Sequence, residues 1–263
     1  MTGQNYVSNE LTHFVGRAVS AHEERFQVFL KILATGWLRA SYRETIGAGF
    51  TVLSDGEKEL SSNDCVISTT LCFCDIPQSD LAIHVNKYGP FGIAFPKAFL
   101  LRHGASPVFY VARNASTSNL EPGIGARTLG ERFDVLHREM TDVITAFEAY
   151  IWEREPESPA RVPGLRLTFK HSPDGTPKGQ QALGKLNSFC GDLEKLVFSY
   201  LKFFTAELPH EDADNYYMER EWRKRNGLAF NVENVAGLYV PASFREPLLA
   251  RHPEYSEKLR CFD

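Results

Sequence analysis

Glu219, Glu221 and Arg223 stand at alternate positions late in the chain, and their types and spacing suggest chemistry most directly. If 216–223 is a strand, its side chains alternate between two faces, so these three would share one face. The two carboxylates would then lie roughly 7 Å apart, and Arg223 would keep at least one of them ionised. Such a pair could bind a polyol or steer a nucleophile. The other interpretation is a solvated edge strand with a structural ion pair.

Four more residues lie where a site could form. His13 ends a short apolar segment just before a helix, and His84 and Tyr88 stand one helical turn apart. Each of these three is either a site residue or an ordinary part of a packed element. Asp75 directly follows a predicted strand, and strand ends open onto the loops where functional groups collect.

Cys72 and Cys74, with His84 nearby, invite a comparison with metal sites. A structural zinc site needs four ligands, which commonly come as two pairs, and the sequence offers no second pair of cysteines. In a strand the two cysteines would share a face, and free buried thiols are common in protein cores. We therefore expect no metal, and we find no local signature of a cysteine nucleophile.

The composition argues against some classes of function. The chain has 263 residues, a net charge of -4 and a pI near 6.1, whereas proteins that coat nucleic acid non-specifically are usually basic. One local basic cluster stands at Arg220, Arg223, Lys224 and Arg225. The start of the sequence lacks a signal-peptide pattern, and no apolar run approaches the ~20 residues of a membrane span. The five cysteines show no disulfide-framework spacing. We expect a cytoplasmic protein that does not cross a membrane.

Hydrophobic periodicity and turn residues predict a single α+β domain over residues 1–263, with a helical insertion at 129–207. Helices are predicted at 20–35, 97–103, 129–155, 183–207 and 243–251. Strands are predicted at 6–14, 66–77, 91–96, 107–112, 216–223, 229–232 and 235–241, and hairpins at 46–64 and 165–172. Ser20 and Glu23 would form a capping box at the first helix, and Gly36 would end that helix.

Several stretches together resemble the AbiGi family of abortive phage-resistance proteins. They are YVSNELTHFVGR near the start, ILATGWL at 32–38, the long segment 71–111 with its order CFCDIP…DL…H…YG.FGIAF, and YYMEREWR at 216–223. AbiGi proteins are described as the antitoxin-like partner of a second protein. The resemblance therefore implies a role in phage defence and a cognate toxin as partner.

The chain also resembles ADP-ribosyltransferases, more loosely. The similarity lies in the order of three elements: a Thr-His-Phe strand, a helix ending Ile-Leu-x-x-Gly-x-Leu, and a late strand that carries a glutamate. It implies small mixed or antiparallel sheets with flanking helices, and NAD as substrate. By position, His13 would contact the NAD ribose, and Phe73 or Tyr88 would stack on nicotinamide. Glu221 would hold the ribose 2′-hydroxyl and stabilise an oxocarbenium-like transition state, with Glu219 two residues before it. Asp75, His84 and Arg223 would complete the NAD-binding set.

Two hypotheses follow from the sequence. In the first, the protein is an NAD-consuming enzyme that transfers ADP-ribose to a nucleic-acid or protein acceptor, or hydrolyses NAD. In the second, it is a non-enzymatic antitoxin or sensor that binds a toxin or a phage component, and the same residues are structural. Long amphipathic helices in 129–207 could then present the interface.

Overall fold

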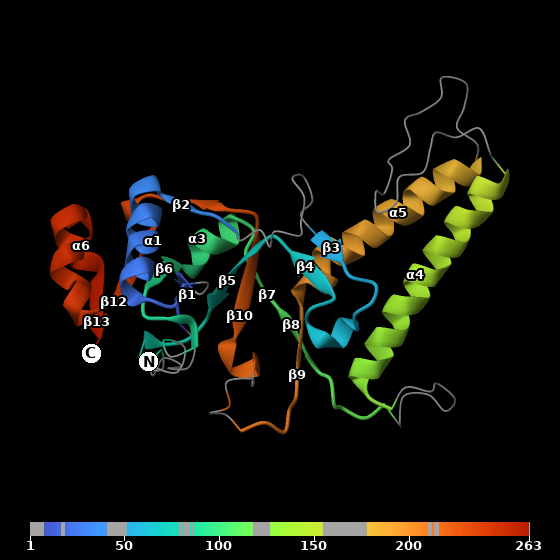
Figure 1. Ribbon diagram of the computed structural model, residues 1–263, viewed down its shortest axis with the longest axis horizontal. Helices are drawn as coiled ribbons and strands as arrows, with labels where there is room; N and C mark the ends of the chain where they lie inside the picture. Colours follow the sequence, from blue (N-terminus) through green and yellow to red (C-terminus); the bar gives the residue numbers. More distant parts are fainter. Residues whose placement is uncertain are drawn as a thin grey trace, which may run out of the picture. The chain divides into compact units, whose positions relative to one another are not determined.

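A computed structural model of the chain shows two compact units (Figure 1). It describes residues 8–16, 19–40, 52–78, 81, 85, 87–117, 127–154, 178–209, 212 and 216–262. The first unit comprises Met1–Thr51, Ser68–Tyr110 and Phe204–Asp263, and the second comprises Val52–Ile67 and Val111–Phe203. The second unit takes in most of the stretch 129–207, and the single-domain organisation stays a prediction.

The first unit is built on a seven-stranded sheet in the order β13-β12-β6-β1-β5-β10-β7. Its strands are β1 Glu10–Phe14, β5 Thr70–Cys74, β6 Gly92–Pro96, β7 Ser106–Pro107, β10 Glu221–Arg225, β12 Gly237–Pro241 and β13 Leu259–Phe262. All neighbours are antiparallel except β12 and β13, which are parallel. This sheet, with its flanking helices, confirms the predicted α+β class.

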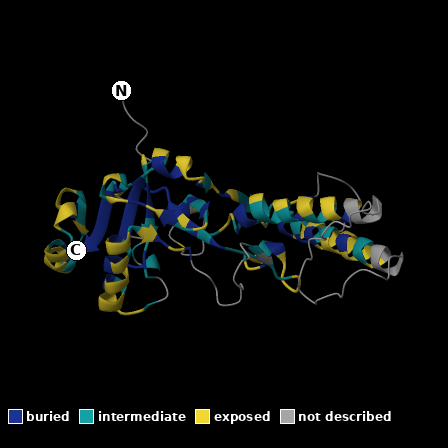
Figure 2. Cartoon of the chain, turned by 90° about the horizontal axis from the view of Figure 1, so that it is seen from above, coloured by how far each residue is buried: buried dark blue, intermediate teal, exposed yellow. Residues whose placement is uncertain are grey.

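One face of the sheet carries the hydrophobic core. Leu11, Phe73, Ile93 and Leu238 point to this face and are almost fully buried, as expected where apolar residues alternate along a strand. Helices pack against them, namely α1 His22–Thr35, α3 Lys97–Arg102 and α6 Arg245–Arg251. Figure 2 shows the strands of this sheet as largely buried.

Helix α1 is capped differently from the prediction at its start but ends where it was predicted to end. Its N-cap is Ala21, which makes no side-chain capping hydrogen bond, so the predicted capping box is wrong. Its end at Gly36 is confirmed: the backbone is left-handed there, with φ +60°, and a β-carbon would lie 2.4 Å from the Phe230 carbonyl oxygen. Only glycine satisfies both conditions without strain.

The remaining elements of the first unit are short. They are β2 Trp37–Leu38, which pairs with β11 Leu228–Ala229, and the 3-10 helices η4 Tyr216–Glu219, η5 Val232–Asn234, η6 Ala242–Phe244 and η7 Pro253–Lys258. The predicted strand 216–223 is wrong in its first half, because residues 216–219 are 3-10 helix. The predicted strand 66–77 is split at Thr69 into β4 Val66–Ser68 and β5.

The second unit is dominated by two helices, α4 Leu129–Arg154 and α5 Lys178–Leu196. Shorter elements lie at β3 Val52–Ser54, which pairs with β4, at η1 Leu60–Ser62, and at η3 Phe198–Tyr200; β8 Phe109–Ala112 pairs with β9 Leu201–Phe204. The helix predicted to reach residue 207 therefore ends at 196. The hairpin predicted at 165–172 and part of that at 46–64 lie outside the described residues.

A small core and one buried polar contact hold the second unit together. Leu60, Cys65, Leu201 and Phe203 form the core cluster. The buried Asp134 of α4 accepts hydrogen bonds from the Ser61 backbone N–H and hydroxyl, both at 2.7 Å. In the part of the chain that the structure describes, no helix has the length and apolar character needed to span a bilayer.

Candidate functional site

Polar side chains gather on the face of the seven-stranded sheet opposite the core. Partners in an antiparallel ladder share a face, and Glu221 lies opposite Cys74, which lies opposite Thr12. Arg223 likewise lies opposite Cys72. Thr12, Cys72, Cys74, Glu221 and Arg223 therefore point to one side, which we call the carboxylate face.

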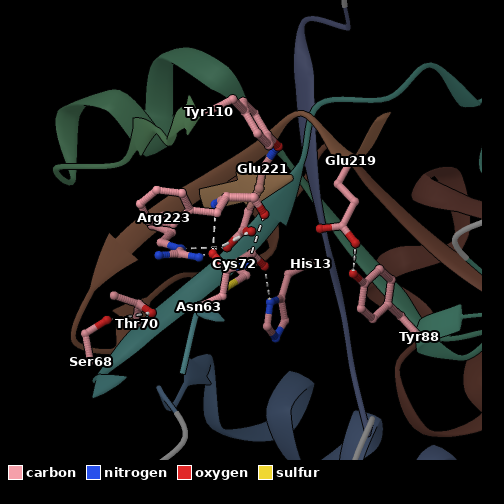
Figure 3. Close-up of polar contacts among 11 residues, drawn as sticks. His13, Asn63, Ser68, Thr70, Cys72, Tyr88, Tyr110, Glu219, Glu221 and Arg223 are labelled. Atoms are coloured by element: carbon pink, nitrogen blue, oxygen red, sulfur yellow. Dashed lines mark hydrogen bonds and ion pairs between the residues drawn. The ribbon is translucent and has the colours of Figure 1, made fainter. Parts of the chain in front are cut away.

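Glu221 and Arg223 form a buried ion pair on this face (Figure 3). Arg223 Nε donates to Glu221 Oε1 at 2.7 Å, as predicted for side chains two residues apart in a strand. Burial alone would lower the pKa of Arg223, but the Glu221 carboxylate outweighs it and raises that pKa. The guanidinium therefore stays charged throughout the physiological range.

Tyr110 fixes the backbone of Glu221. The Glu221 N–H donates to the Tyr110 hydroxyl oxygen at 2.6 Å. Burial raises the pKa of Tyr110, so the phenol keeps its proton and can donate it to a further acceptor. No local pattern in the sequence predicts this contact, because it joins residues 111 positions apart.

Glu219 reaches the site from a turn rather than from a strand. It ends η4, and Arg220 then takes a left-handed backbone with φ +45° before β10 begins at Glu221. The simple alternation predicted for Glu219 and Glu221 is therefore broken. The buried Glu219 carboxylate instead accepts from Lys87 Nζ at 2.8 Å and from the Tyr88 hydroxyl.

His13 lies where β1 and β5 separate. Within the described residues, the register between these strands is a single pair, Thr12 opposite Cys74. Beyond it, His13 Nδ1 lies 2.8 Å from the Cys72 carbonyl oxygen (Figure 3). A carbonyl only accepts, so Nδ1 carries the hydrogen. Burial lowers the pKa of His13, so the ring is neutral near pH 7 and Nε2 can act as an acceptor.

The strand register places the Cβ atoms of His13 and Glu221 on opposite faces of the sheet. His13 follows Thr12 in β1, so its Cβ points to the core face, where its ring contacts Phe73 at 5.6 Å between centroids. Strand β5 lies between β1 and β10. A ligand that touches both side chains would therefore have to reach both faces of the sheet.

The other predicted site residues have different surroundings. Phe73 is only 2% exposed and belongs to the hydrophobic core, whereas Tyr88 is half-buried and stacks on Phe14 at 6.1 Å. Asp75 is buried at the end of β5, where it pairs with Lys97 at 2.8 Å and with Arg220 at 3.4 Å. His84 lies outside the described residues.

The Cys74 thiol of this face is a poor nucleophile and a poor metal ligand. Burial, helped by the nearby Glu219 carboxylate, raises the pKa of Cys74 to about 12, and the thiolate is the reactive form of cysteine. Among the described residues, no three histidine, cysteine or acidic side chains gather as the ligands of a metal ion would.

The site brings two carboxylates close to one aromatic ring. Both Glu219 and Glu221 act electrostatically on Tyr110, and Tyr88 is bonded to Glu219. Ionised carboxylates fixed in a partly buried place can stabilise positive charge that develops on a bound sugar. The two glutamates, Arg223 and Tyr88 are candidates that the sequence alone suggests, whereas Tyr110 and Lys87 join them only in the structure.

One protein family matches the chain, and its description reads "Putative abortive phage resistance protein AbiGi, antitoxin". The match covers residues 52–240, well over half of the sequence, so the chain belongs to the AbiGi family. That family description assigns it to abortive phage resistance. No curated protein and no solved structure matches the chain.

Proposed function

We propose that this AbiGi-family protein acts in phage defence as an NAD-consuming enzyme of the ADP-ribosyltransferase kind. One observation carries the proposal. The first, middle and late strands of the resemblance, which hold His13, Phe73 and Glu221, are three successive neighbours in the sheet, β1, β5 and β10. Strands far apart in sequence thus place a histidine and a glutamate on two strands that only β5 separates.

In the proposed reaction the bond between ribose C1′ and the nicotinamide nitrogen breaks. Nicotinamide leaves as a neutral ring with the electron pair, and an oxygen or nitrogen of the acceptor attacks C1′ and loses a proton. The acceptor is a nucleic acid, a protein or water. The Glu221 carboxylate would hold the ribose 2′-hydroxyl and stabilise the oxocarbenium-like transition state.

The neighbouring groups take supporting roles in this proposal. Arg223 and Tyr110 fix the carboxylate and the backbone of Glu221. His13 Nε2 would accept a hydrogen bond from a ribose hydroxyl, because Nδ1 is engaged by the Cys72 carbonyl. Of the two aromatic residues considered for stacking on nicotinamide, Tyr88 is the accessible one, since Phe73 is core.

A cellular experiment tests the proposal. The protein is expressed from an inducible promoter, and NAD in cell extracts is measured over time beside growth. The proposal expects NAD to fall and growth to stop, with both effects lost in Glu221→Gln and kept in Glu246→Gln, an exposed glutamate of α6. Unchanged NAD in infected and uninfected cells would contradict it.

The family description favours a second candidate function, an antitoxin that binds a cognate toxin. In that case the protein alone leaves NAD and growth unchanged, and its co-expression rescues cells from the toxin. Glu221→Gln would then rescue as well as the wild type does. The same induction experiment, repeated with the toxin present, therefore separates the two functions.

A further inference from the structure

The helices of the second unit expose large apolar side chains to solvent. Leu136 and Val143 of α4 are 44% and 60% exposed, and Phe189 and Leu196 of α5 are 60% and 59% exposed. Single exposed apolar residues are ordinary on protein surfaces, whereas a contiguous group marks an interaction site. Whether these four are contiguous depends on how the two helices pack.

The two helices are antiparallel neighbours (Figure 1). Asn187 donates to Glu148 at 3.3 Å, and the ring of His137 meets that of Phe198 at 5.4 Å. Later residues of α4 thus meet earlier residues of the segment that holds α5. These two contacts also show which residues of the two helices lie at the same height along the helix pair. Position 139 of α4, for example, lies beside position 196 of α5.

Three of the four exposed apolar residues sit one position before a buried residue. Leu136 precedes His137, Val143 precedes Ile144, and Phe189 precedes Cys190. One residue turns the helix by about 100°. The buried residues of each helix face the other helix, and the residue before each of them is turned away from that contact. Because the two helices are antiparallel, this turn points the exposed residues of both helices to the same side of the helix pair. The exposed residues of both helices therefore form one surface.

The spacing along this surface alternates between three and four residues. The members, exposed or half-buried, are Leu136, Met140, Val143 and Phe147 on α4, and Leu186, Phe189, Leu193 and Leu196 on α5. We call these eight residues the hairpin face. Such spacing is that of a helix that packs against further helices by interdigitating side chains. The other side is covered at its base, where Asp134 binds Ser61 of η1.

We propose that the hairpin face joins two copies of this chain into a dimer, as the centre of an antiparallel four-helix bundle. A second copy offers an equal two-helix surface, and so covers both rows of the hairpin face at once. This inference goes beyond the proposed function and is independent of whether the protein consumes NAD.

The exposed area is enough for a stable dimer. Four side chains of this size, about half exposed, amount to roughly 400 Å² of apolar surface per copy. Two copies would bury about 800 Å², and an interface that is about 65% apolar would then total about 1,200 Å². That total reaches the lower limit of about 1,200 Å² for stable specific interfaces.

The charges of the two helices favour the same arrangement. The sequence of α4 has six acidic and three basic residues, whereas α5 has three basic and two acidic residues. A twofold axis parallel to the helices places each α4 against α5 of the second copy, so that helices of opposite net charge are neighbours.

The test is the mass of the intact protein in solution, by sedimentation equilibrium and by light scattering after size exclusion. The wild type is expected at twice the 29.7 kDa of the chain. Val143→Glu with Phe189→Glu should raise the dissociation constant at least tenfold. The matched control is Thr145→Glu with Ser188→Glu, which adds the same charges at exposed positions outside the hairpin face and should stay dimeric.

Two further substitutions in the hairpin face supply a second readout. Leu136→Glu and Leu196→Glu should each weaken the dimer, while far-ultraviolet circular dichroism stays unchanged in all variants. A wild type that remains monomeric at about 100 µM overturns the proposal and leaves the hairpin face to a different protein. The proposal is also overturned if the protein with both Val143→Glu and Phe189→Glu remains as dimeric as the wild type.

Discussion

Replacing Arg223 by methionine should destabilise the sheet of the first unit strongly. The substitution keeps an unbranched stem but removes the guanidinium that lies 2.7 Å from the Glu221 carboxylate. Breaking a buried ion pair from one side costs about 3–5 kcal/mol, because it leaves a charge in a place that water reaches poorly. The Arg223 side chain is 16% exposed, so we take the lower end, about 3 kcal/mol.

Urea unfolding at pH 7.5, followed by circular dichroism, measures this loss. Arg223→Met combined with Glu221→Gln removes the buried charge and should recover at least half of the lost stability. Arg245→Met breaks an exposed pair with Glu246 and should cost less than about 0.5 kcal/mol. If Arg223→Met costs no more than this control, the pair does not stabilise the sheet and our account of the carboxylate face is wrong.

Three further predictions concern other parts of the chain. Gly36→Ala should lower stability by more than about 1 kcal/mol in thermal unfolding, because the left-handed backbone and the Phe230 carbonyl leave no room for a β-carbon; an unchanged melting temperature would contradict this. Burial lowers the pKa of His137, so the unfolded chain binds its proton more readily, and stability should fall as pH drops below about 6.5. His137→Gln should flatten that fall, and equal slopes in both proteins would exclude His137 as its source. Tyr88→Ala should raise the KM for NAD about fivefold to tenfold, whereas Tyr88→Phe, which keeps the ring but loses the bond to Glu219, should leave KM nearly unchanged; equal effects would rule out stacking.

Local patterns in the sequence were sufficient to predict a helix or strand and its ends where one physical signal dominated. The helical spacing of Phe26, Phe29, Leu30 and Leu33, followed by Gly36, predicted α1 and its end. The strand at 91–96 and the helix after it were likewise found within one residue. In these segments the hydrophobic period and the punctuating residues agree with the final fold.

The errors arose where tertiary structure overrides a local period. The helical spacing of Val197, Tyr200 and Phe204 continues that of α5, yet the chain turns into β9. Arg220 takes a left-handed backbone conformation that could not be predicted from the sequence. Glycine and asparagine are the residues that usually indicate this conformation, and arginine is not. Strand β13 was missed, since four residues beside a parallel partner carry little periodic signal.

The candidate site could be predicted in its residues but only partly in its geometry. Glu221 and Arg223 share a face because strand alternation is a local property. The positions of His13 and Tyr110 depend on which strands become neighbours, and that is decided by contacts across the whole chain. The burial of Phe73 in the core follows from the same pairing.

The central claim, that the carboxylate face cleaves NAD, is tested most directly by nicotinamide release from NAD by the purified protein, with cell extract added as a source of acceptors. Our account predicts steady release that falls about 10²–10³-fold in Glu221→Gln, assayed at a temperature where circular dichroism shows this variant to be folded, while Glu246→Gln releases nicotinamide at the wild-type rate. No release by the wild type, or equal release by Glu221→Gln, would contradict it and favour the antitoxin function.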